Sequence, residues 1–503
     1  MLKNKCLHEA KQDFTPDFTC ALALQSPENA LQVVGFFSNG TLTCADTQAC
    51  APLVRDALKH CAIKEGEKIF ISPNILVMAA NHPDTLKGWQ ELGAKLLRAV
   101  PADRVGALIL DALSWEEVAA AAYGCEVSSW RLERFHTAAR PLPPRCKKAV
   151  IVTVHAEDED FKKQRAQDHH LAQSVHWARD IANRPGNDIT PEHFMRCVDA
   201  FKDLGITVNV LDQEALEKKG FGALLGVAQG SIHKPYVVTA EWRGAGADVP
   251  MVALVGKGVT FDTGGISIKP SNNMGEMKLD KTGAVVVAAT VRTLALQKAC
   301  VNVVAVLALV ENMPSGSAQR PGDIVTSLSG QTIEVLDTDA EGRLILADAL
   351  TYVEGEFSPS VIIDIATLTG AVRAALGPVY AGVFSRHNDL VSQLVSSGEK
   401  TGEALWPLPL HKEYDEAMNS NCADMKNISG PGFGAGSSTA AQFLARFVKK
   451  DQRWAHLDIA GVDMAGKETV LCPRGGSAFG VQLLVRWLLD HHDSVATGSD
   501  ACR

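Results

Sequence analysis

Residues 250–265, PMVALVGKGVTFDTGG, join an apolar run to a group of charged side chains. The run PMVALVG is almost wholly apolar, which is typical of a strand that is buried on both faces of a parallel sheet. Three later runs have the same character, namely VNVVAVLALV at 301–310, PSVIIDIA at 359–366 and AHLDIAG at 455–461. Helical patterns separate these runs, so the sequence predicts an α/β protein with a doubly wound, mostly parallel sheet.

The same alternation of strands and helices occurs nearer the N-terminus, where KIFISPNILVMA at 68–79 is one of the expected strands. A chain of 503 residues exceeds the size of a single compact core, so at least two domains are expected. The predicted parts are a smaller N-terminal α/β domain at 1–155, a linking helix at 156–184, a catalytic domain at 185–490 and a frayed tail at 491–503.

Composition excludes some classes of protein and leaves others open. The formal net charge of −9 argues against a protein that mainly binds nucleic acid, although a basic cluster at 131–148 keeps that alternative open. Twelve cysteines are scattered without a CxxC pair, as expected for reduced thiols in the cytoplasm. No apolar run reaches the roughly 20 residues that a membrane-spanning helix needs, so we expect a soluble intracellular protein.

The stretch VLDTDAEGRLILADAL, at 335–350, places Asp337, Asp339, Glu341 and Arg343 on alternate positions. If this stretch is extended, all four side chains share one face. The apolar spacing of LILADALTYV predicts a buried helix directly afterwards, which would draw the carboxylates inside. One arginine cannot neutralise three carboxylates, whereas a divalent metal ion could. For this stretch alone, a solvated acidic loop remains an alternative.

A second polar cluster follows the strand of the opening stretch. It contains Lys257, Asp262, Lys269 and Asp280, interrupted by glycines that permit a tight backbone. The carboxyl ends of strands are where open α/β sheets place their ligand sites. A nucleotide loop of the GxxxxGK[ST] type is absent. Taken alone, the cluster could still represent ordinary surface salt bridges.

Six motifs together resemble the leucyl aminopeptidase family, the dinuclear-metal cytosol aminopeptidases. The motifs are GKGVTFDTGGISIKP (256–270), MKLDKTGA (277–284), ENMPSGSAQRPGD (311–323), DTDAEGRLILADAL (337–350), DIATLTGA (364–371) and WAHLDIAGV (454–462). Their order and spacing make the resemblance specific over roughly residues 175–485. Residues 1–155 carry no comparably sharp motif.

The resemblance implies a role for each matching residue. The ligands of a tightly held metal would be Lys257, Asp262, Asp280 and Glu341, and those of a second, exchangeable metal would be Asp262, Asp339 and Glu341. Lys269 would bind the oxygen of the scissile carbonyl group, and Arg343 would hold a bicarbonate ion that acts as a base. Residues matching the family's substrate-binding positions are Met277, Thr367, Leu368 and Gly370.

The activity implied is removal of N-terminal residues, with Leu and other apolar residues preferred, from short peptides. Two divalent ions per subunit, Mn²⁺ or Zn²⁺, would hold the attacking water between them. The family also implies a homohexamer without a membrane partner. Two alternatives are a DNA-binding architectural protein and an inactive scaffold homologue. The chain departs from common family patterns at Asp337, Lys281 and Thr282, which bear on metal preference and pocket shape.

Overall fold

The four apolar runs form neighbouring strands of one sheet, as predicted. They correspond to β9 (Val252–Asp262), β10 (Asn302–Asn312), β13 (Val361–Ala366) and β17 (Arg453–Asp458). These strands pair in parallel in the order β17-β13-β9-β10. Their carboxyl ends therefore meet at one edge of the sheet.

Antiparallel strands extend this sheet on both sides, to give the order β15-β14-β17-β13-β9-β10-β8-β7. On one side β14 is antiparallel to β17, and on the other β8 is antiparallel to both β10 and β7. The outer strands are β7 (Thr207–Leu211), β8 (Tyr236–Arg243), β14 (Ala381–Ser385) and β15 (Leu405–Pro407). The sheet is thus mixed, with a parallel centre.

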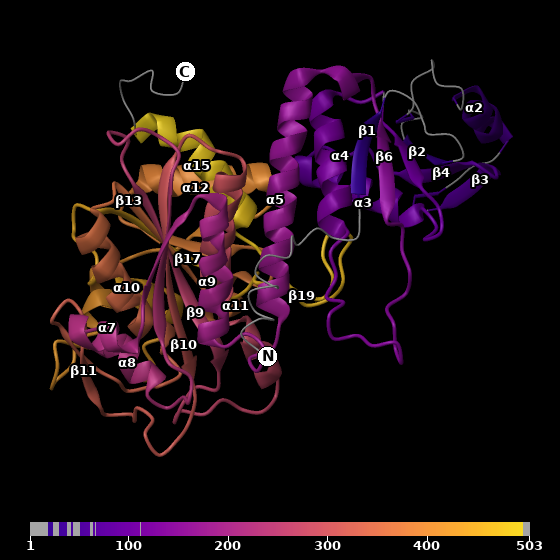
Figure 1. Ribbon diagram of the computed structural model, residues 1–503. Coiled ribbons are helices and arrows are strands. Elements are labelled where there is room, and N and C mark those ends of the chain that lie inside the picture. Colours follow the sequence, from indigo (N-terminus) through magenta and orange to yellow (C-terminus); the bar gives the residue numbers. More distant parts are fainter. Residues whose placement is uncertain are drawn as a thin grey trace. The chain divides into compact units, whose positions relative to one another are not determined.

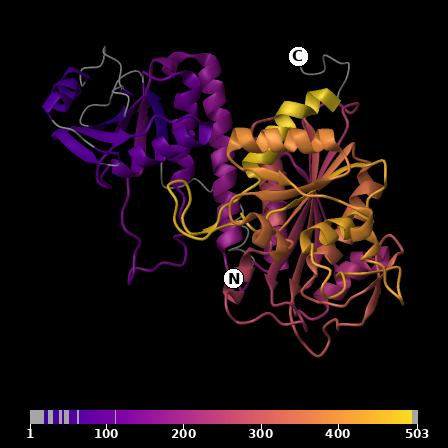
Figure 2. The ribbon, with the colours of Figure 1, turned by 180° about the vertical axis from the view of Figure 1, so that it is seen from behind.

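Helices cover both faces of the eight-stranded sheet (Figure 1, Figure 2). One face carries α9 (Thr282–Leu296), α12 (Asn388–Thr401) and α15 (Val481–Val495), and the other carries α8 (Gly222–Ala228), α10 (Gly342–Phe357) and α14 (Gly436–Ala445). Shorter elements of this part are α6 (Pro191–Asp199), η2 (Ala200–Leu204), α7 (Gln213–Lys219), η3 (Met274–Leu279), β11 (Ile324–Thr326), β12 (Thr332–Glu334), α11 (Gly370–Leu376), α13 (Lys412–Glu416), β16 (Met425–Lys426), β18 (Met464–Ala465) and β19 (Gly475–Gly476).

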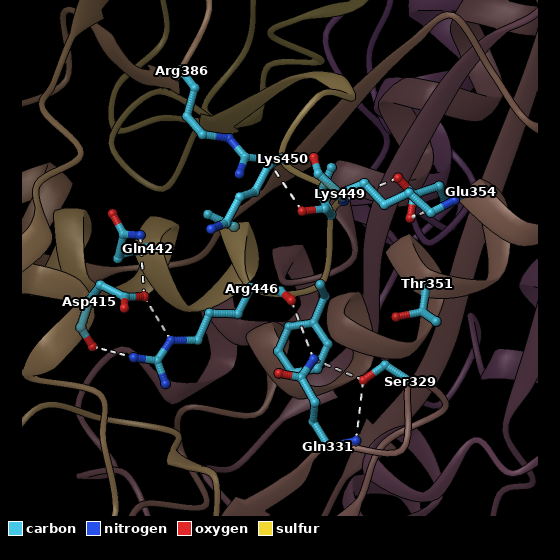
Figure 3. A pocket seen from close by; sticks show the side chains of 13 residues that line it. Ser329, Gln331, Thr351, Glu354, Arg386, Asp415, Gln442, Arg446, Lys449 and Lys450 are labelled. Carbon is cyan, nitrogen blue, oxygen red and sulfur yellow. Dashed lines mark hydrogen bonds and ion pairs between the residues drawn. The ribbon is translucent and has the colours of Figure 1, made fainter.

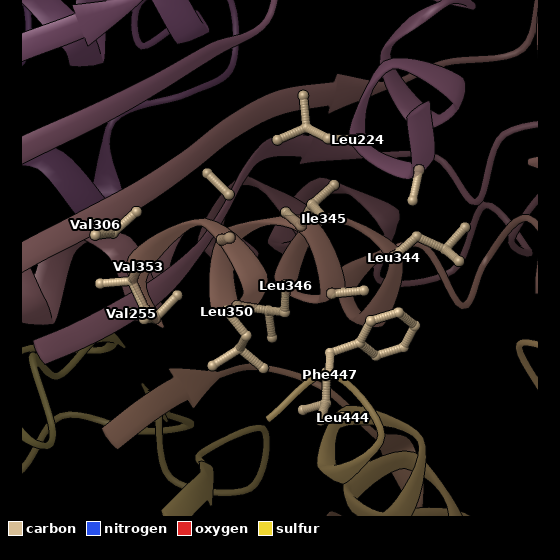
Figure 4. Packing of buried hydrophobic residues seen from close by; sticks show 14 of the residues in the cluster. Leu224, Val255, Val306, Leu344, Ile345, Leu346, Leu350, Val353, Leu444 and Phe447 are labelled. Atoms are coloured by element: carbon tan, nitrogen blue, oxygen red, sulfur yellow. The ribbon is translucent and has the colours of Figure 1, made fainter. Parts of the chain in front are cut away.

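Helix α10 is the predicted buried helix, and it lies within a large apolar cluster (Figure 4). Its Leu346 and Leu350 are fully buried, together with Val255 and Val306 of the sheet and Leu444 of α14. Burying an aliphatic side chain of this size stabilises a fold by about 1.5–3 kcal/mol. This packing fixes the N-terminus of α10, where the acidic stretch ends.

The computed structural model describes residues 19–23, 30–37, 42–43, 51–60, 64–65, 67–110 and 112–495. Contacts divide the chain into two units. Among the described residues, unit 1 comprises 177–466 and 474–495, and unit 2 comprises those of 19–176 together with 467–473. The eight-stranded sheet belongs to unit 1.

Unit 2 is built on a sheet of order β1-β6-β5-β2-β4-β3. Its pairs are parallel except β3 with β4. The run KIFISPNILVMA, expected as a strand, is instead an antiparallel hairpin that turns at Pro73 and Asn74. The elements of unit 2 are β1 (Thr19–Ala23), β2 (Leu31–Phe37), α2 (Ala51–His60), β3 (Lys68–Ser72), β4 (Ile75–Ala80), α3 (Leu86–Ala99), β5 (Gly106–Ile109), α4 (Trp115–Ser128), β6 (Lys148–Val152) and η1 (Val154–Glu157).

The segment predicted as a linking helix contains α5 (Glu159–Asn183), and the boundary between the units, at Trp177, falls within it. The predicted frayed tail begins too early, because residues 491–495 still belong to α15. The rest of that tail lies outside the described residues. Among the described helices, none is both long and apolar enough to span a bilayer.

Candidate metal centre

Lys257 occupies the middle of a buried ion-pair network. It lies within β9, and its Nζ is 2.9 Å from Asp280 Oδ1 and 2.9 Å from Glu341 Oε1. The same ammonium group donates a hydrogen bond to the Thr367 carbonyl oxygen at 3.0 Å. One lysine is therefore the meeting point of four elements, namely β9, η3, the start of α10 and the end of β13.

Asp262, the last residue of β9, is fixed by three donors. Its Oδ1 accepts hydrogen bonds from Gly264 N at 2.8 Å and Asn312 Nδ2 at 2.9 Å, and its Oδ2 lies 2.8 Å from Lys269 Nζ. The backbone then turns back at Gly264, whose φ is 85°. Residues that carry a Cβ atom rarely adopt this conformation, whereas glycine adopts it readily. This turn brings Lys269 within contact of both Asp262 and Asp339.

Three buried carboxylates come close enough together to hold a cation. Asp262, Asp280 and Glu341 each place an oxygen within 4.8 Å of the others. Among the described residues, Asp280 Oδ2 and Glu341 Oε2 are buried without a hydrogen-bond partner. Unpaired buried carboxylate oxygens are costly, and oxygen ligands suit hard divalent ions. The residues present therefore fit a divalent metal site.

Burial and mutual repulsion perturb the carboxyl groups of this cluster. Burial, with the nearby charges of Glu341 and Asp262, raises the pKa of Asp280. Burial and Asp262 likewise raise the pKa of Glu341. A cation among these groups would favour their ionised forms.

At the two lysines, the effect of the neighbouring charges on the pKa outweighs the effect of burial. Burial opposes the charge on Lys257, but Asp280 and Glu341 outweigh it and raise the pKa of the ammonium group. Burial is likewise outweighed at Lys269, chiefly by Asp262, so its pKa is also raised. Lys257 is thus a charged ion-pair partner in this arrangement, and it would have to lose its proton to coordinate a metal.

The acidic stretch is a turn and not the extended row considered from the sequence. Ala340 N donates to the Asp337 carbonyl oxygen at 3.3 Å, and Asp339 N donates to Asp337 Oδ1 at 2.9 Å. Asp337 therefore caps the turn. The stretch's own arginine is not the partner of its carboxylates, because Lys269 pairs with Asp339 and Lys257 pairs with Glu341.

Arg343 is instead buried beside the acidic turn, near the N-terminus of α10. Its Nη1 donates to the Asn427 carbonyl oxygen at 2.6 Å, while its Nε has no hydrogen-bond partner among the described residues. Burial lowers the pKa of Arg343 to about 10, despite the nearby Glu341 and Asp458. A buried guanidinium with a free donor at a helix N-terminus suits an anion.

The substrate-binding residues implied by the resemblance line one cavity of about 390 Å³ together with most of the proposed ligands. Its wall includes Lys257, Asp262, Lys269, Asp280, Asp339, Met277, Thr367, Leu368 and Gly370. Glu341 and Arg343 are not on its wall. Glu341 joins the group through Lys257, whereas Arg343 bonds the Asn427 carbonyl oxygen.

Sequence reasoning missed three residues that fix the loops of the site. Asn312 bridges Asp262 and the Thr338 carbonyl oxygen, and Asn427 bonds the acidic turn through Leu336 N at 2.8 Å. Asp458 accepts hydrogen bonds from the backbone after β13. Asn312 and Asp458 are the last residues of buried strands, and a polar residue at that position could have been predicted to belong to the site. The sequence around Asn427 carries no such signal.

Lys281, one of the departures from the family pattern, is fully buried. Its Nζ donates to the carbonyl oxygens of Arg184, at 3.0 Å, and Lys278. Burial lowers the pKa of Lys281 to about 7, and Lys278 and Arg184 add to the shift. The neighbouring Thr282 donates to the Leu279 carbonyl oxygen at 2.5 Å. Both side chains thus bond backbone next to the cavity rather than pointing into it as ligands.

The basic cluster at 131–148 lies in unit 2. Arg131 pairs with Glu133, and Arg131, Arg145 and Arg98 line a cavity of about 690 Å³. Burial and the two neighbouring guanidinium groups lower the pKa of Arg145 to about 10. These contacts describe a local crowding of arginines and are not specific to nucleic acid.

The fold and site define a doubly wound α/β protein with a buried carboxylate and lysine centre at the carboxyl ends of its strands. The sequence profile of the cytosol aminopeptidase family, catalytic domain, matches residues 176–485. A probable cytosol aminopeptidase of Rickettsia bellii is 43% identical over 412 residues, covering 80% of this chain and 82% of that protein. The chain belongs to the cytosol aminopeptidase family, as the sequence motifs predicted.

Solved structures of similar proteins have the same fold over nearly the whole chain. The bottromycin maturation enzyme BotP in complex with Mn is 28% identical, with a TM-score of 0.81, covering 93% of this chain and 100% of that one. A cytosol aminopeptidase from Coxiella burnetii is 27% identical, with a TM-score of 0.79, covering 94% of this chain and 99% of that one.

Proposed function

We propose that this chain is a two-metal aminopeptidase that releases N-terminal residues, Leu and other apolar ones preferred, from short peptides. The observation that carries the proposal is the buried group of Asp262, Asp280 and Glu341, with carboxylate oxygens that have no partner among the described residues. Lys269 shares a cavity with two of these carboxylates. A cation-binding group beside an ammonium group suits hydrolysis of a peptide bond, because the two together can activate water and stabilise the negative charge that develops on the carbonyl oxygen.

The proposed ligands are the five residues implied by the resemblance, Lys257, Asp262, Asp280, Asp339 and Glu341. When bound, two divalent ions, Mn²⁺ or Zn²⁺, would polarise the peptide carbonyl group and lower the pKa of a water molecule held between them. Lys269 remains cationic and would donate hydrogen bonds to the carbonyl oxygen as it becomes negative.

Arg343 would hold bicarbonate, the proposed base. Its buried guanidinium keeps one donor without a partner among the described residues, and its fork matches a planar anion. Removal of a proton from the attacking water by that anion would need no protein carboxylate, which leaves the carboxylates available as ligands.

The cavity wall supports the expected preference for apolar N-terminal residues. Met277, Leu279 and Leu368 line it close to the ligand residues Asp280 and Lys257. Thr367 and Gly370 complete the proposed substrate wall. A cavity of about 390 Å³ suits one side chain and the adjoining peptide bond, so short peptides are the proposed substrates.

Relatives named cytosol aminopeptidases support a proposed cytoplasmic location. Assembly as a homohexamer is also part of the proposal, by family resemblance. No contact of the basic cluster favours the architectural DNA-binding alternative.

The test is hydrolysis of leucine amide by metal-stripped protein, with and without Mn²⁺ in bicarbonate buffer. Activity should appear only with metal, and Asp339→Ala should abolish it while preserving the fold by circular dichroism. Absence of activity with Mn²⁺, Zn²⁺ and Co²⁺ would overturn the proposal and favour the inactive scaffold.

A further inference from the structure

A second cavity of unit 1 lies far from the metal centre and has a volume of about 530 Å³ (Figure 3). Its wall comes from the loop between β11 and β12, the later turns of α10, the residue after β14, and the segment between α14 and β17. We call it the basic cavity. Glu354 lies on its wall, thirteen positions after Glu341, so helix α10 separates the two sites by about 20 Å at 1.5 Å per residue.

The basic cavity has more positive than negative side chains. Its cations are Arg386, Arg446, Lys449 and Lys450, and its carboxylates are Asp415 and Glu354. The whole chain, by contrast, has a net charge of −9. A concave surface lined by one sign of charge concentrates the potential and attracts small ions of the other sign.

Two of the four cations are already neutralised by the two carboxylates. Arg446 Nε lies 2.7 Å from Asp415 Oδ1, and Lys449 Nζ lies 3.8 Å from Glu354 Oε2. Figure 3 shows both pairs on the cavity wall. No carboxylate pairs with Arg386 or Lys450 within this described part of the chain, so two positive charges face the cavity without an ion-pair partner.

Arg386 is held in position without using all its donors. Its Nη2 donates to the carbonyl oxygens of Val448 at 3.3 Å and Lys449 at 3.0 Å, and its guanidinium lies over the Trp454 ring at 5.9 Å. These bonds leave Nε and Nη1 available. Burial lowers the pKa of Arg386, although Glu354 and Asp451 oppose the shift. A partly desolvated, pre-positioned guanidinium gains most from an anion that can accept two hydrogen bonds.

Neutral polar groups complete the wall of the basic cavity. Ser329 and Thr351 supply hydroxyl groups, and Gln331 and Gln442 supply amides. Figure 3 shows Arg386, Lys449 and Lys450 on one side of the cavity, and Ser329 and Gln331 on the other. Thr351 Oγ1 already donates to the Ala347 carbonyl oxygen, and Gln442 Nε2 donates to Asp415 Oδ1. Arg386 and Lys450 are therefore the main groups left to bind an anion, and two unpaired cations suit an anion with more than one charge.

We propose that the basic cavity binds a small, multiply charged oxyanion, such as a phosphate or carboxylate compound, through Arg386 and Lys450. The site is separate from the metal centre and does not depend on the proposed peptidase activity.

The test is isothermal titration of the full-length chain with pyrophosphate and, separately, with citrate, in a chloride buffer. Lys450→Glu is the informative variant, because Lys450 is exposed and its replacement leaves the core intact. Lys218→Glu is the matched control, because it makes the same charge change at an exposed position of α7 outside the cavity.

We expect saturable binding that weakens at least tenfold in Lys450→Glu and changes less than twofold in Lys218→Glu. Arg386→Lys should also weaken it, since an ammonium group cannot donate in a planar fork. Tighter binding of pyrophosphate than citrate would identify phosphate compounds as the ligand class, and the reverse would identify carboxylates.

Three results would overturn the proposal. These are no saturable binding of either anion, equal weakening by both lysine variants, and unchanged affinity in Lys450→Glu. The last would mean that the anion binds elsewhere, for instance at Arg343 or at metal.

Discussion

Lys257 lies so close to the backbone of Gly342 that a Cβ atom at Gly342 would come within 2.7 Å of Lys257 Cδ, Cε and Nζ. Real Cβ contacts are essentially never that short, so a side chain at position 342 would displace the end of the Lys257 side chain. The close approach, and not the backbone conformation, is what favours glycine here. The contact connects the first residue of α10 with the ammonium group that pairs with Asp280 and Glu341.

We predict that Gly342→Ala abolishes peptidase activity, with a loss of at least about 100-fold in kcat/KM, because Lys257 cannot keep its position beside both carboxylates. Overpacking of this kind also lowers the free energy of unfolding by about 1–3 kcal/mol. Urea unfolding and leucine amide hydrolysis would measure the two effects.

Gly355→Ala is the matched control, since Gly355 belongs to the same helix and a Cβ there meets nothing within 4 Å. It should leave activity unchanged and raise the free energy of unfolding by about 0.5–1 kcal/mol. If Gly342→Ala were as active as Gly355→Ala, the proposed role of Lys257 would be wrong.

Lys269→Met should lower kcat by about 100- to 1,000-fold, because the carbonyl oxygen loses the cation that stabilises its developing charge. Lys269→Arg keeps the charge and should recover part of the loss. Steady-state kinetics on leucine amide would separate kcat from KM. A rise in KM at constant kcat would show instead that Lys269 only helps to bind the substrate.

Asn427→Ala should destabilise the acidic turn. Asn427 Nδ2 donates to the Asp337 carbonyl oxygen at 2.6 Å, and its Oδ1 accepts from Leu336 N at 2.8 Å. The variant loses the partner of Leu336 N and one of the two donors to the Asp337 carbonyl oxygen, the other being Ala340 N, at a cost of about 0.5–1.5 kcal/mol in unfolding free energy per bond. Asn427→Asp keeps the acceptor for Leu336 N but sets a buried carboxylate oxygen against the Asp337 carbonyl oxygen, so it should cost more. Urea unfolding would measure the unfolding free energy of both variants, and the reverse order of their stabilities would contradict this account.

The buried pair of His456 and Asp364 should make stability depend on pH. His456 Nδ1 lies 2.5 Å from Asp364 Oδ1, and both side chains are fully buried. Burial opposes the charge on His456, but Asp364 outweighs it, so the pKa of the imidazole is raised. Since the unfolded pKa is about 6.5, the pair stabilises fully below that pH and less as pH rises through the folded pKa.

Urea unfolding of wild type and His456→Asn at pH 6 and pH 9 would test this linkage. The difference in unfolding free energy should be larger at pH 6. His411→Asn, on a histidine exposed to solvent, controls for the general effect of pH. A difference that grows towards pH 9 would show that His456 is buried in its neutral form.

The sequence predicted the centre of the fold because burial on both faces leaves a clear pattern. The strands around β9 are near-continuous apolar runs, and α10 has apolar residues at helical spacing. The antiparallel outer strands were not predicted. Strand β7, TVNVL, is short and half-exposed, so its composition does not separate it from a loop. The hairpin at Pro73 was missed because apolar residues continue on both sides of its turn.

The candidate site could be assembled from the sequence only through family motifs. Alternation suggested an extended acidic stretch, whereas the local capping of Asp339 N by Asp337 produces a turn. Pairing of Lys257 with Glu341 joins residues that are far apart in the chain, and periodicity does not reveal such contacts. Asn427 was missed for the same reason. His456, by contrast, lies within a buried apolar run that the sequence predicted as a strand, and it bonds Asp364 there.

Residues 467–473 belong to unit 2, although almost 300 residues of unit 1 separate them from the rest of it. Within unit 2, Arg98 Nη2 donates to the Thr469 carbonyl oxygen at 3.0 Å and lies 3.1 Å from Glu468 Oε1. A ribosome adding about 5–20 residues per second delivers this segment on the order of tens of seconds after Arg98. Unit 2 therefore receives these contacts only after residues 177–466 of unit 1 have been made, so its completion is coupled to synthesis of unit 1.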